Sequence, residues 1–133
     1  VSYWDFDVLA GAGGLYSTLR DLLQFVTISL HPPKTLIGQA IVLSQKPQFQ
    51  TTALGFPQAT AMGWQIITPG FSKTPILWHN GGTGGFVSFI AIDPAQDCGV
   101  ILLSNYGDAI AGDNTLDNIG MSLLRDAAKV SLQ

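Results

Sequence analysis

The spacing of apolar residues predicts three helices. The first follows Thr18, which stands three residues before Asp21 as in a capping box, and it ends before Pro32 and Pro33. Apolar residues at helical spacing predict a second helix over 35–45 and a third within 114–130. The positions expected to face a core are Leu19, Leu22, Leu23, Val26 and Leu30 in the first helix, Leu36, Ile37, Ala40, Ile41 and Leu43 in the second, and Leu116, Ile119, Leu123, Leu124 and Ala127 in the third.

Between the second and third predicted helices the pattern changes to short apolar runs. Residues 46–60 are polar and predict a loop, whereas 62–68, 76–80, 85–93 and 98–105 predict strands. The tetrapeptide "PAQD" predicts a hairpin turn between the last two strands. The strand over 85–93 is apolar on both faces, with Phe86, Ile90 and Ile92 on one face and Val87, Phe89 and Ala91 on the other.

This two-sided apolar strand decides the predicted fold class. A sheet that is apolar on both sides needs a layer of structure against each face, and the predicted helices can supply both layers. We therefore predict an α/β (α+β) fold in which an antiparallel sheet is flanked by helices in an α/β/α sandwich. The 133 residues fit one domain or part of one, and because the sequence begins with Val1 we expect it to come from a longer protein.

Composition excludes several classes of function. The chain is 47% apolar and 11% charged, with a formal net charge of −3, so it lacks the dense basic patch that nucleic-acid binding needs. No apolar stretch reaches the ~20 residues of a membrane-spanning helix. The single cysteine, Cys98, allows no internal disulfide. The two histidines, His31 and His79, are too few for a zinc site, so we expect neither a metal nor another cofactor.

A glycine-rich stretch, "HNGGTGG" over 79–85, carries most of the candidate chemistry. Its spacing is not that of a dinucleotide-binding or phosphate-binding loop, and a predicted strand follows it rather than a helix. One interpretation is a flexible connection between two strands. The other is a substrate-binding edge, because glycines leave backbone N–H groups accessible to a substrate that lies along the strand, or to an oxyanion. Spacing alone leaves both interpretations open.

Four motifs occur in the order "GGLYST", "MGWQI", "HNGGTGGFVSFIAIDP" and "GVILLSN". This ordered set resembles the C-terminal part of the serine β-lactamase-like hydrolases, which include class C β-lactamases, D-alanyl-D-alanine carboxypeptidases, D-aminopeptidases and related esterases. The resemblance extends from about Gly11 to the last predicted helix. It implies a partial β-lactamase/transpeptidase-like sandwich, catalysis through an acylated serine, and a periplasmic or secreted location for the parent protein.

The resemblance also implies roles within the glycine-rich stretch. The family combines Ser-x-x-Lys, Tyr-x-Asn and Lys-Thr-Gly motifs in one cleft, and His79, Asn80 and Gly81 stand where the third motif stands. It implies that the N–H of Gly82 is an oxyanion donor, that His79 is catalytic, and that Asn80, Gly81 and Thr83 bind substrate. Because His is mostly neutral near pH 7, the replacement of Lys predicts weak binding of a β-lactam carboxylate.

The first two family motifs have no counterpart in this sequence. Its nearest approach to Ser-x-x-Lys is "STLR", in which Ser17 is interpreted as a helix cap, and none of its tyrosines begins Tyr-x-Asn. In the family both motifs precede the "GGLYST" stretch. We therefore expect residues 1–133 to be the C-terminal portion of a single domain without its nucleophile, and to be inactive alone, since losing a catalytic serine costs about six powers of ten in rate.

Two functions follow from these observations. The first is a part of a serine hydrolase that acts on D-amino-acid peptides, β-lactams or esters. The alternative is a non-catalytic module that binds a peptide or a partner chain along the strand over 76–80. If strands from an N-terminal part are missing, an apolar strand edge is open, so we expect self-association or pairing with that part.

Overall fold

The computed structural model describes residues 4–52, 58–106 and 115–130. Residues 53–57 of the predicted loop and the first residue of the range predicted for the third helix lie outside the described residues. In chain order the elements are a 3-10 helix η1 (Asp7–Ala12), helices α1 (Leu19–Leu30) and α2 (Leu36–Ser44), strands β1 (Phe49–Thr51), β2 (Gln58–Thr60), β3 (Gln65–Ile67), β4 (Ile76–Gly82), β5 (Val87–Asp93) and β6 (Cys98–Ser104), and helix α3 (Leu116–Val130).

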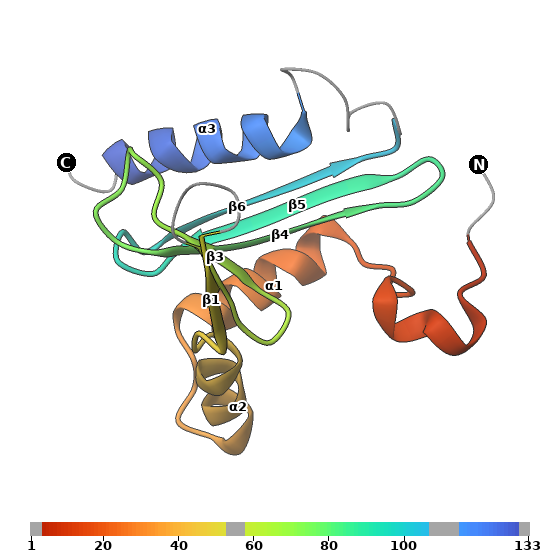
Figure 1. The fold of residues 1–133 in the computed structure, drawn as a ribbon, viewed down its shortest axis with the longest axis horizontal. Coiled ribbons are helices and arrows are strands. Elements are labelled where there is room, and N and C mark those ends of the chain that lie inside the picture. Colours follow the sequence, from red (N-terminus) through yellow and green to blue (C-terminus); the bar gives the residue numbers. More distant parts are fainter. Residues whose placement is uncertain (1–3, 53–57, 107–114, 131–133) are drawn as a thin grey trace.

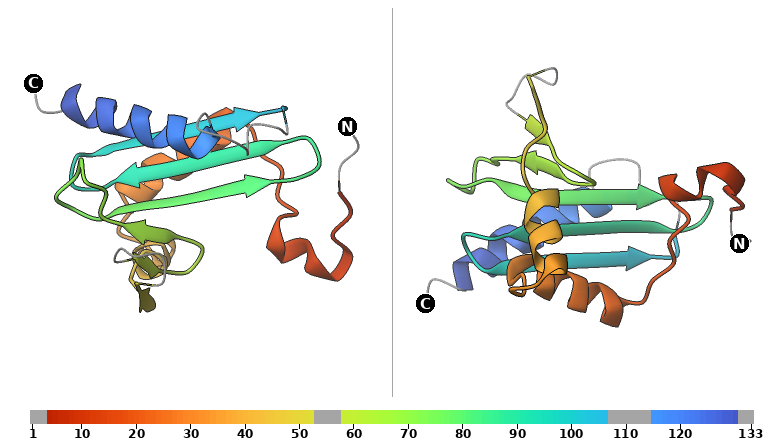
Figure 2. Two further views of the ribbon diagram at one scale, coloured as in Figure 1. Left: turned by 45° about the horizontal axis from the view of Figure 1, so that its top comes forward. Right: turned by 90° about the horizontal axis from the view of Figure 1, so that it is seen from below.

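The six strands form one antiparallel sheet in which every strand pairs with its neighbours in the sequence, in the order β1-β2-β3-β4-β5-β6. Strands β4, β5 and β6 have seven residues each, whereas β1, β2 and β3 have three. Helix α3 covers one face of the long strands and α1 covers the other (Figure 1 and Figure 2). The predicted antiparallel sheet between helices is confirmed.

The core between the sheet and α3 is built around Phe89. This side chain, Ile76, Ala91 and Leu124 of α3 are at most 1% exposed and form one cluster. Helix α3 approaches the sheet closely at Gly120, where an added Cβ would overlap the Phe89 ring. Each large apolar side chain buried here contributes about 1.5–3 kcal/mol to the free energy of unfolding, so this cluster fixes α3 to the sheet.

A second core lies on the opposite face, under α1. Val26 of α1 packs in one cluster with Trp64, Leu77 and Ile92, all at most 6% exposed. Phe25 stacks on Trp64 with ring centroids 6.0 Å apart. Since β4 and β5 contribute side chains to both clusters, the two-sided apolar pattern predicted for the sheet reflects these two cores.

Two predictions from the sequence are wrong. Residues 46–60 were predicted as a loop but contain the short strands β1 and β2. Strands of three residues are too short to show an alternation of apolar and polar side chains. Strand β4 continues to Gly82 instead of ending at the glycines, because Ser88 and Val87 of β5 pair with Gly81 and Gly82. Gly81 and Gly82 therefore belong to β4 through their backbone pairing with β5, although glycines have no side-chain pattern from which a strand could be predicted.

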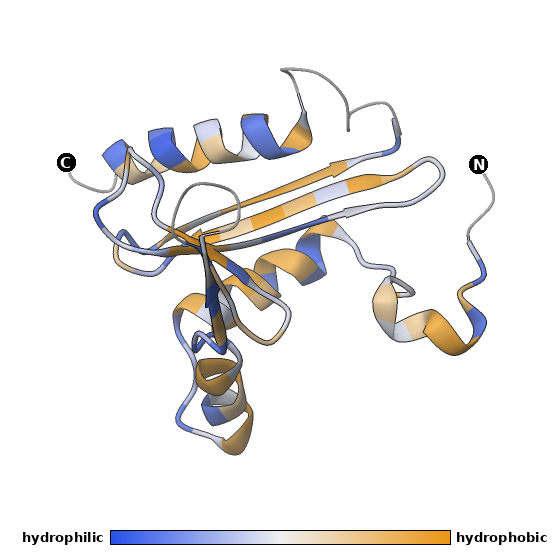
Figure 3. Ribbon diagram, in the orientation of Figure 1, coloured by the Kyte–Doolittle hydropathy of each residue, from blue (hydrophilic) through white to orange (hydrophobic). Residues whose placement is uncertain are grey.

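The predicted apolar faces of the helices are only partly buried. The structure buries Val26 of α1 and Leu124 of α3, and Figure 3 shows that apolar residues also line the parts of α2 that project away from the sheet. Helical spacing identifies residues that share a face, but a second layer must cover that face before it becomes core. The residues predicted for the core but found exposed are Leu19, Leu23, Leu36, Ile37, Ala40, Leu43, Ile119 and Leu123, together with Phe86, which lies outside β5.

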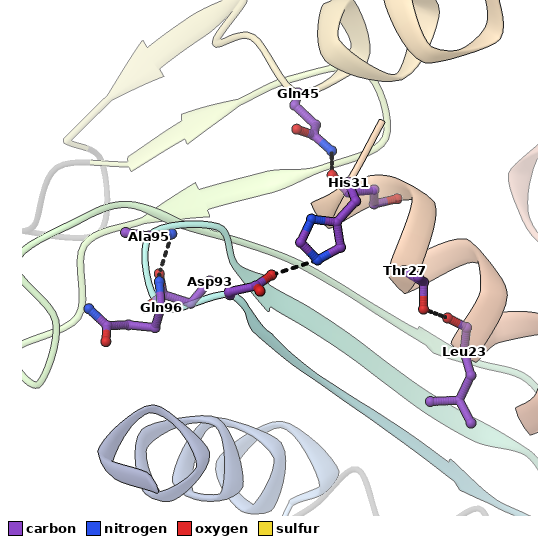
Figure 4. A network of polar contacts seen from close by, with 9 residues as sticks. Leu23, Thr27, His31, Gln45, Asp93, Ala95 and Gln96 are labelled. Atoms are coloured by element: carbon purple, nitrogen blue, oxygen red, sulfur yellow. Dashed lines mark hydrogen bonds and ion pairs between the residues drawn. The ribbon is translucent and has the colours of Figure 1, made fainter. Parts of the chain in front are cut away.

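The turn between β5 and β6 is tied to the end of α1 (Figure 4). His31, the C-cap of α1, lies 2.9 Å from the carboxylate of Asp97 in this turn. The buried carboxylate of Asp93 accepts hydrogen bonds from the N–H groups of Ala95 and Gln96 at 3.1 and 3.2 Å. The hairpin predicted at "PAQD" is confirmed, and its polar contacts hold the end of the sheet that lies opposite the glycine-rich stretch.

Within the described ranges, no helix is long and apolar enough to cross a membrane. No group of three His, Cys, Asp or Glu side chains among the same residues is arranged to hold a metal ion.

Candidate functional site

One edge of strand β4 pairs with a neighbouring strand along only about half of its length. Strand β5 pairs with β4 from Leu77 to Gly82, but β3 pairs only with its first three residues, where Ile67 and Gln65 meet Ile76 and Trp78. A tight turn joins β2 to the start of β3, and in it the N–H of Ala61 donates to the carbonyl of Trp64 at 2.8 Å. Residues 79–82 therefore extend past the end of β3, and we call them the open edge of β4.

The register shows which backbone groups of the open edge point outward. The N–H of Thr83 donates to the carbonyl of Phe86 at 2.9 Å at the end of the β4–β5 hairpin. Because hydrogen-bonded and non-bonded pairs alternate in an antiparallel ladder, Gly81 and His79 direct their backbone groups toward β5. Asn80 and Gly82 direct theirs away from β5, on the side that β3 does not reach.

This geometry corrects the strand edge predicted over 76–80. Its first three residues lie inside the sheet, because β3 pairs with them, and Ile76 and Leu77 are buried. Only His79 and Asn80 of that segment belong to the open edge, which continues through Gly81 and Gly82. The point along β4 at which pairing with β3 stops could not be predicted from the residues of β4. It depends on the length of β3, which is a separate segment of only three residues.

The two polar side chains of the open edge lie on opposite faces of the sheet, as alternate residues of a strand must. The exposed His79 ring contacts the backbone carbonyl of its neighbour Asn80 through Nδ1. The Asn80 side chain lies on the α3 face, where its Nδ2 donates to the Asp117 carboxylate at 2.7 Å. Asp117 stands in the first turn of α3, and no sequence pattern predicts that it would reach the glycine-rich stretch.

Close approach explains two of the glycines. A Cβ added to Gly81 would lie 2.9 Å from the hydroxyl oxygen of Ser88 on β5. A Cβ added to Gly84, in the hairpin turn, would lie 2.6 Å from the indole nitrogen of Trp4. The N-terminal segment therefore packs against the turn that follows the open edge, and the hydroxyl of Tyr16 reaches the carbonyl of Trp4 at 3.4 Å. Sequence reasoning missed this contact, which joins residues 80 positions apart.

The structure thus places all five predicted site residues at one end of the sheet. His79, Asn80, Gly81 and Gly82 form the open edge, and Thr83 begins the turn. A hollow of about 400 Å³ lies elsewhere, over β1, β2 and β3, and its lining residues include no titratable side chain. The open edge can offer backbone donors and an imidazole to a ligand, but it carries no activated serine.

Comparison with known proteins identifies the family of this chain. The sequence model of the Beta-lactamase family matches residues 2–119. This chain belongs to the Beta-lactamase family. Its curated relatives include the D-alanyl-D-alanine-carboxypeptidase/endopeptidase AmpH of Escherichia coli strain K12 and its counterpart in strain O157:H7, each 24% identical over 82% of this chain and 31% of the relative.

A solved class C β-lactamase has the same fold, with a TM-score of 0.60 at 16% identity over 88% of this chain and 36% of that structure. The chain therefore spans about a third of the length of the curated relatives it matches. Membership of the family and its antiparallel fold confirm the resemblance drawn from the four ordered motifs.

Proposed function

We propose that this chain forms one wall of the active site of a serine hydrolase that works through an acyl-enzyme. The open edge of β4 carries the proposal, because the N–H groups of Asn80 and Gly82 point away from the sheet at the place where the family positions its third motif. A substrate can lie along such an edge as an additional strand. The nucleophile of the proposed enzyme lies outside residues 1–133.

Each residue of the open edge has a part in this proposal. The N–H of Gly82 stabilises the oxyanion of the acyl intermediate, to which a single backbone donor contributes about 3 kcal/mol. His79 donates a hydrogen bond to the substrate or to the intermediate. Gly81 lets the strand lie close to Ser88, while the backbone of Asn80 and the turn at Thr83 border the bound substrate.

The substrate class follows from the relatives and from the geometry together. The curated relatives are named as carboxypeptidases and endopeptidases that act at D-alanyl-D-alanine. An extended peptide with D-amino acids, a related ester or a β-lactam presents a carbonyl to an edge strand. We therefore propose these three substrate types for the whole protein, together with a periplasmic or secreted location.

Without a nucleophile, residues 1–133 should not hydrolyse these substrates. The oxyanion donor stabilises charge only when an attacking group creates it. The full-length gene product should therefore hydrolyse an uncharged nitrophenyl ester, and this chain should not. Hydrolysis by the isolated chain, or no hydrolysis by the full-length product, would count against the proposal and favour a non-catalytic module that binds peptides along β4.

A pair of variants tests the donor itself in the full-length product. Gly82→Pro removes the N–H without removing a bond to β5, and Gly82→Ala keeps the N–H as the matched control. We expect the acylation rate to fall about 10²–10³-fold in the proline variant and far less in the alanine variant. Equal losses in both would show that the backbone donor has no special role.

A further inference from the structure

The open edge of β4 is bordered by a negative charge. The Asp117 carboxylate accepts the amide of Asn80 at 2.7 Å on the α3 face, and Asn80 is separated from Gly82 by one residue. At the 3.2–3.4 Å rise of a strand, that places the carboxylate within about 10 Å of the outward N–H of Gly82. Asp117 is only half-buried and Asn80 is exposed, so the charge can act on whatever occupies the edge.

No positive charge among the described residues is bonded to Asp117 or to the open edge. Arg125 and Lys129 form ion pairs with Asp126 at the far end of α3. His31 pairs with Asp97 at the opposite end of the sheet. The helix N-terminus beside Asp117 carries about half a positive charge, which one full carboxylate outweighs. His79, on the other face, is an imidazole rather than the lysine of the β-lactamases.

We propose that Asp117 is a specificity-determining residue, and that the site disfavours substrates with a carboxylate next to the scissile bond and accepts neutral or cationic ones. This inference rests on the proposed function, because it names the substrate class of the same edge. Asp117 also acts as a positioning residue, since its bond to Asn80 holds that side chain on the α3 face and away from the edge.

Three thioesters of N-acetyl-D-alanine separate the charge effect from catalysis itself. Their leaving groups are thioglycolate, methyl thioglycolate and thiocholine, which carry a negative charge, no charge and a positive charge. Because these thiols differ in acidity, each kcat/KM is divided by the rate constant for hydroxide hydrolysis of the same thioester at high salt, and these normalised values are compared. Hydrolysis by the full-length gene product is followed through the released thiol. We expect kcat/KM for the thioglycolate ester to be about threefold to tenfold below that for the methyl ester, with the thiocholine ester at least equal to the methyl ester.

Asp117→Asn keeps an acceptor for Asn80 and removes the charge. It should raise kcat/KM for the thioglycolate ester, relative to that for the methyl ester, about threefold to tenfold, mostly through KM. Asp126→Asn, nine residues and about 13 Å further along the helix, is the matched control and should leave the charge preference unchanged. Raising the salt to 0.5 M should shrink the wild-type preference, whereas a purely structural role would not respond to salt.

The outcomes separate the inference from the proposed function. Hydrolysis of all three thioesters with equal efficiency, or with a preference for thioglycolate, overturns the inference while the hydrolase proposal stands. An unchanged preference in Asp117→Asn, measured on a variant with wild-type circular dichroism, overturns the role of Asp117. If none of the thioesters is hydrolysed, the proposed function fails and the inference fails with it.

Discussion

The two halves of β4 share one strand but have different surroundings. Residues 76–78 lie between β3 and β5 and contribute Ile76 and Leu77 to the two cores. Residues 79–82 have β5 on one side only and are all exposed. The covered half holds the sheet together, and the open half leaves backbone donors accessible. A three-residue neighbour, β3, creates this difference by ending before β4 does.

The largest difference between the halves should appear in stability. Ile76→Ala removes a side chain with no exposed area and leaves a cavity, which should lower the free energy of unfolding by about 2–5 kcal/mol. His79→Ala changes an exposed side chain and should alter it by less than about 0.5 kcal/mol. Urea denaturation of both variants measures the contrast, and a similar cost for the two would mean that the halves are not distinct.

Proline substitutions should distinguish inward from outward backbone N–H groups within the open half. The N–H of Gly81 points toward β5 whereas that of Gly82 points outward. Gly81→Pro should therefore cost about 3 kcal/mol, because it removes a ladder bond and places a ring inside the hairpin. Gly82→Pro should cost about 1 kcal/mol or less, since proline is tolerated on a free edge. A reversed order in the denaturation midpoints would show that the register of β4 is different.

The two halves of β4 also differ in how far their structure could be predicted from the sequence. The covered half was predicted as a strand because Ile76 and Leu77 begin an apolar run. The ordered motifs identified the family and led to five candidate site residues. The open half could not be predicted as strand, because glycines have no side-chain pattern and only pairing with β5 defines it. The contacts of Asp117 with Asn80 and of Trp4 with Gly84 join distant segments, and no local periodicity encodes them.

The edge of the sheet along β6 should favour association rather than catalysis. Among the described residues, no strand pairs with the outer side of β6, which contains Val100, Ile101, Leu102 and Leu103. Such an edge can pair with a second copy or with another part of the protein. Leu103 is 47% exposed, so Leu103→Lys should be tolerated and should reduce self-association by about tenfold or more. Analytical ultracentrifugation that finds the unmodified chain monomeric at high concentration would contradict the expectation.

The smallest expected effect concerns Cys98, at the same end of the sheet as the covered half of β4. Partial burial, with a smaller contribution from the Asp93 and Asp97 carboxylates, raises the pKa of its thiol above the ordinary value of 9.0. Folding therefore favours the protonated thiol, so its contribution to stability is present below pH 9 and is lost as the pH rises through the raised value. Iodoacetamide should modify Cys98 at pH 8 more slowly than a free peptide thiol, and denaturation should abolish the difference.

Amide hydrogen exchange of this chain, followed residue by residue by NMR, measures whether the outward amides of the open edge are accessible. We expect an alternation along the open edge, with slow exchange at His79 and Gly81, which bond to β5, and exchange at least a hundredfold faster at Asn80 and Gly82. Uniform protection of all four amides would mean that the edge is covered, and it would contradict the proposed site.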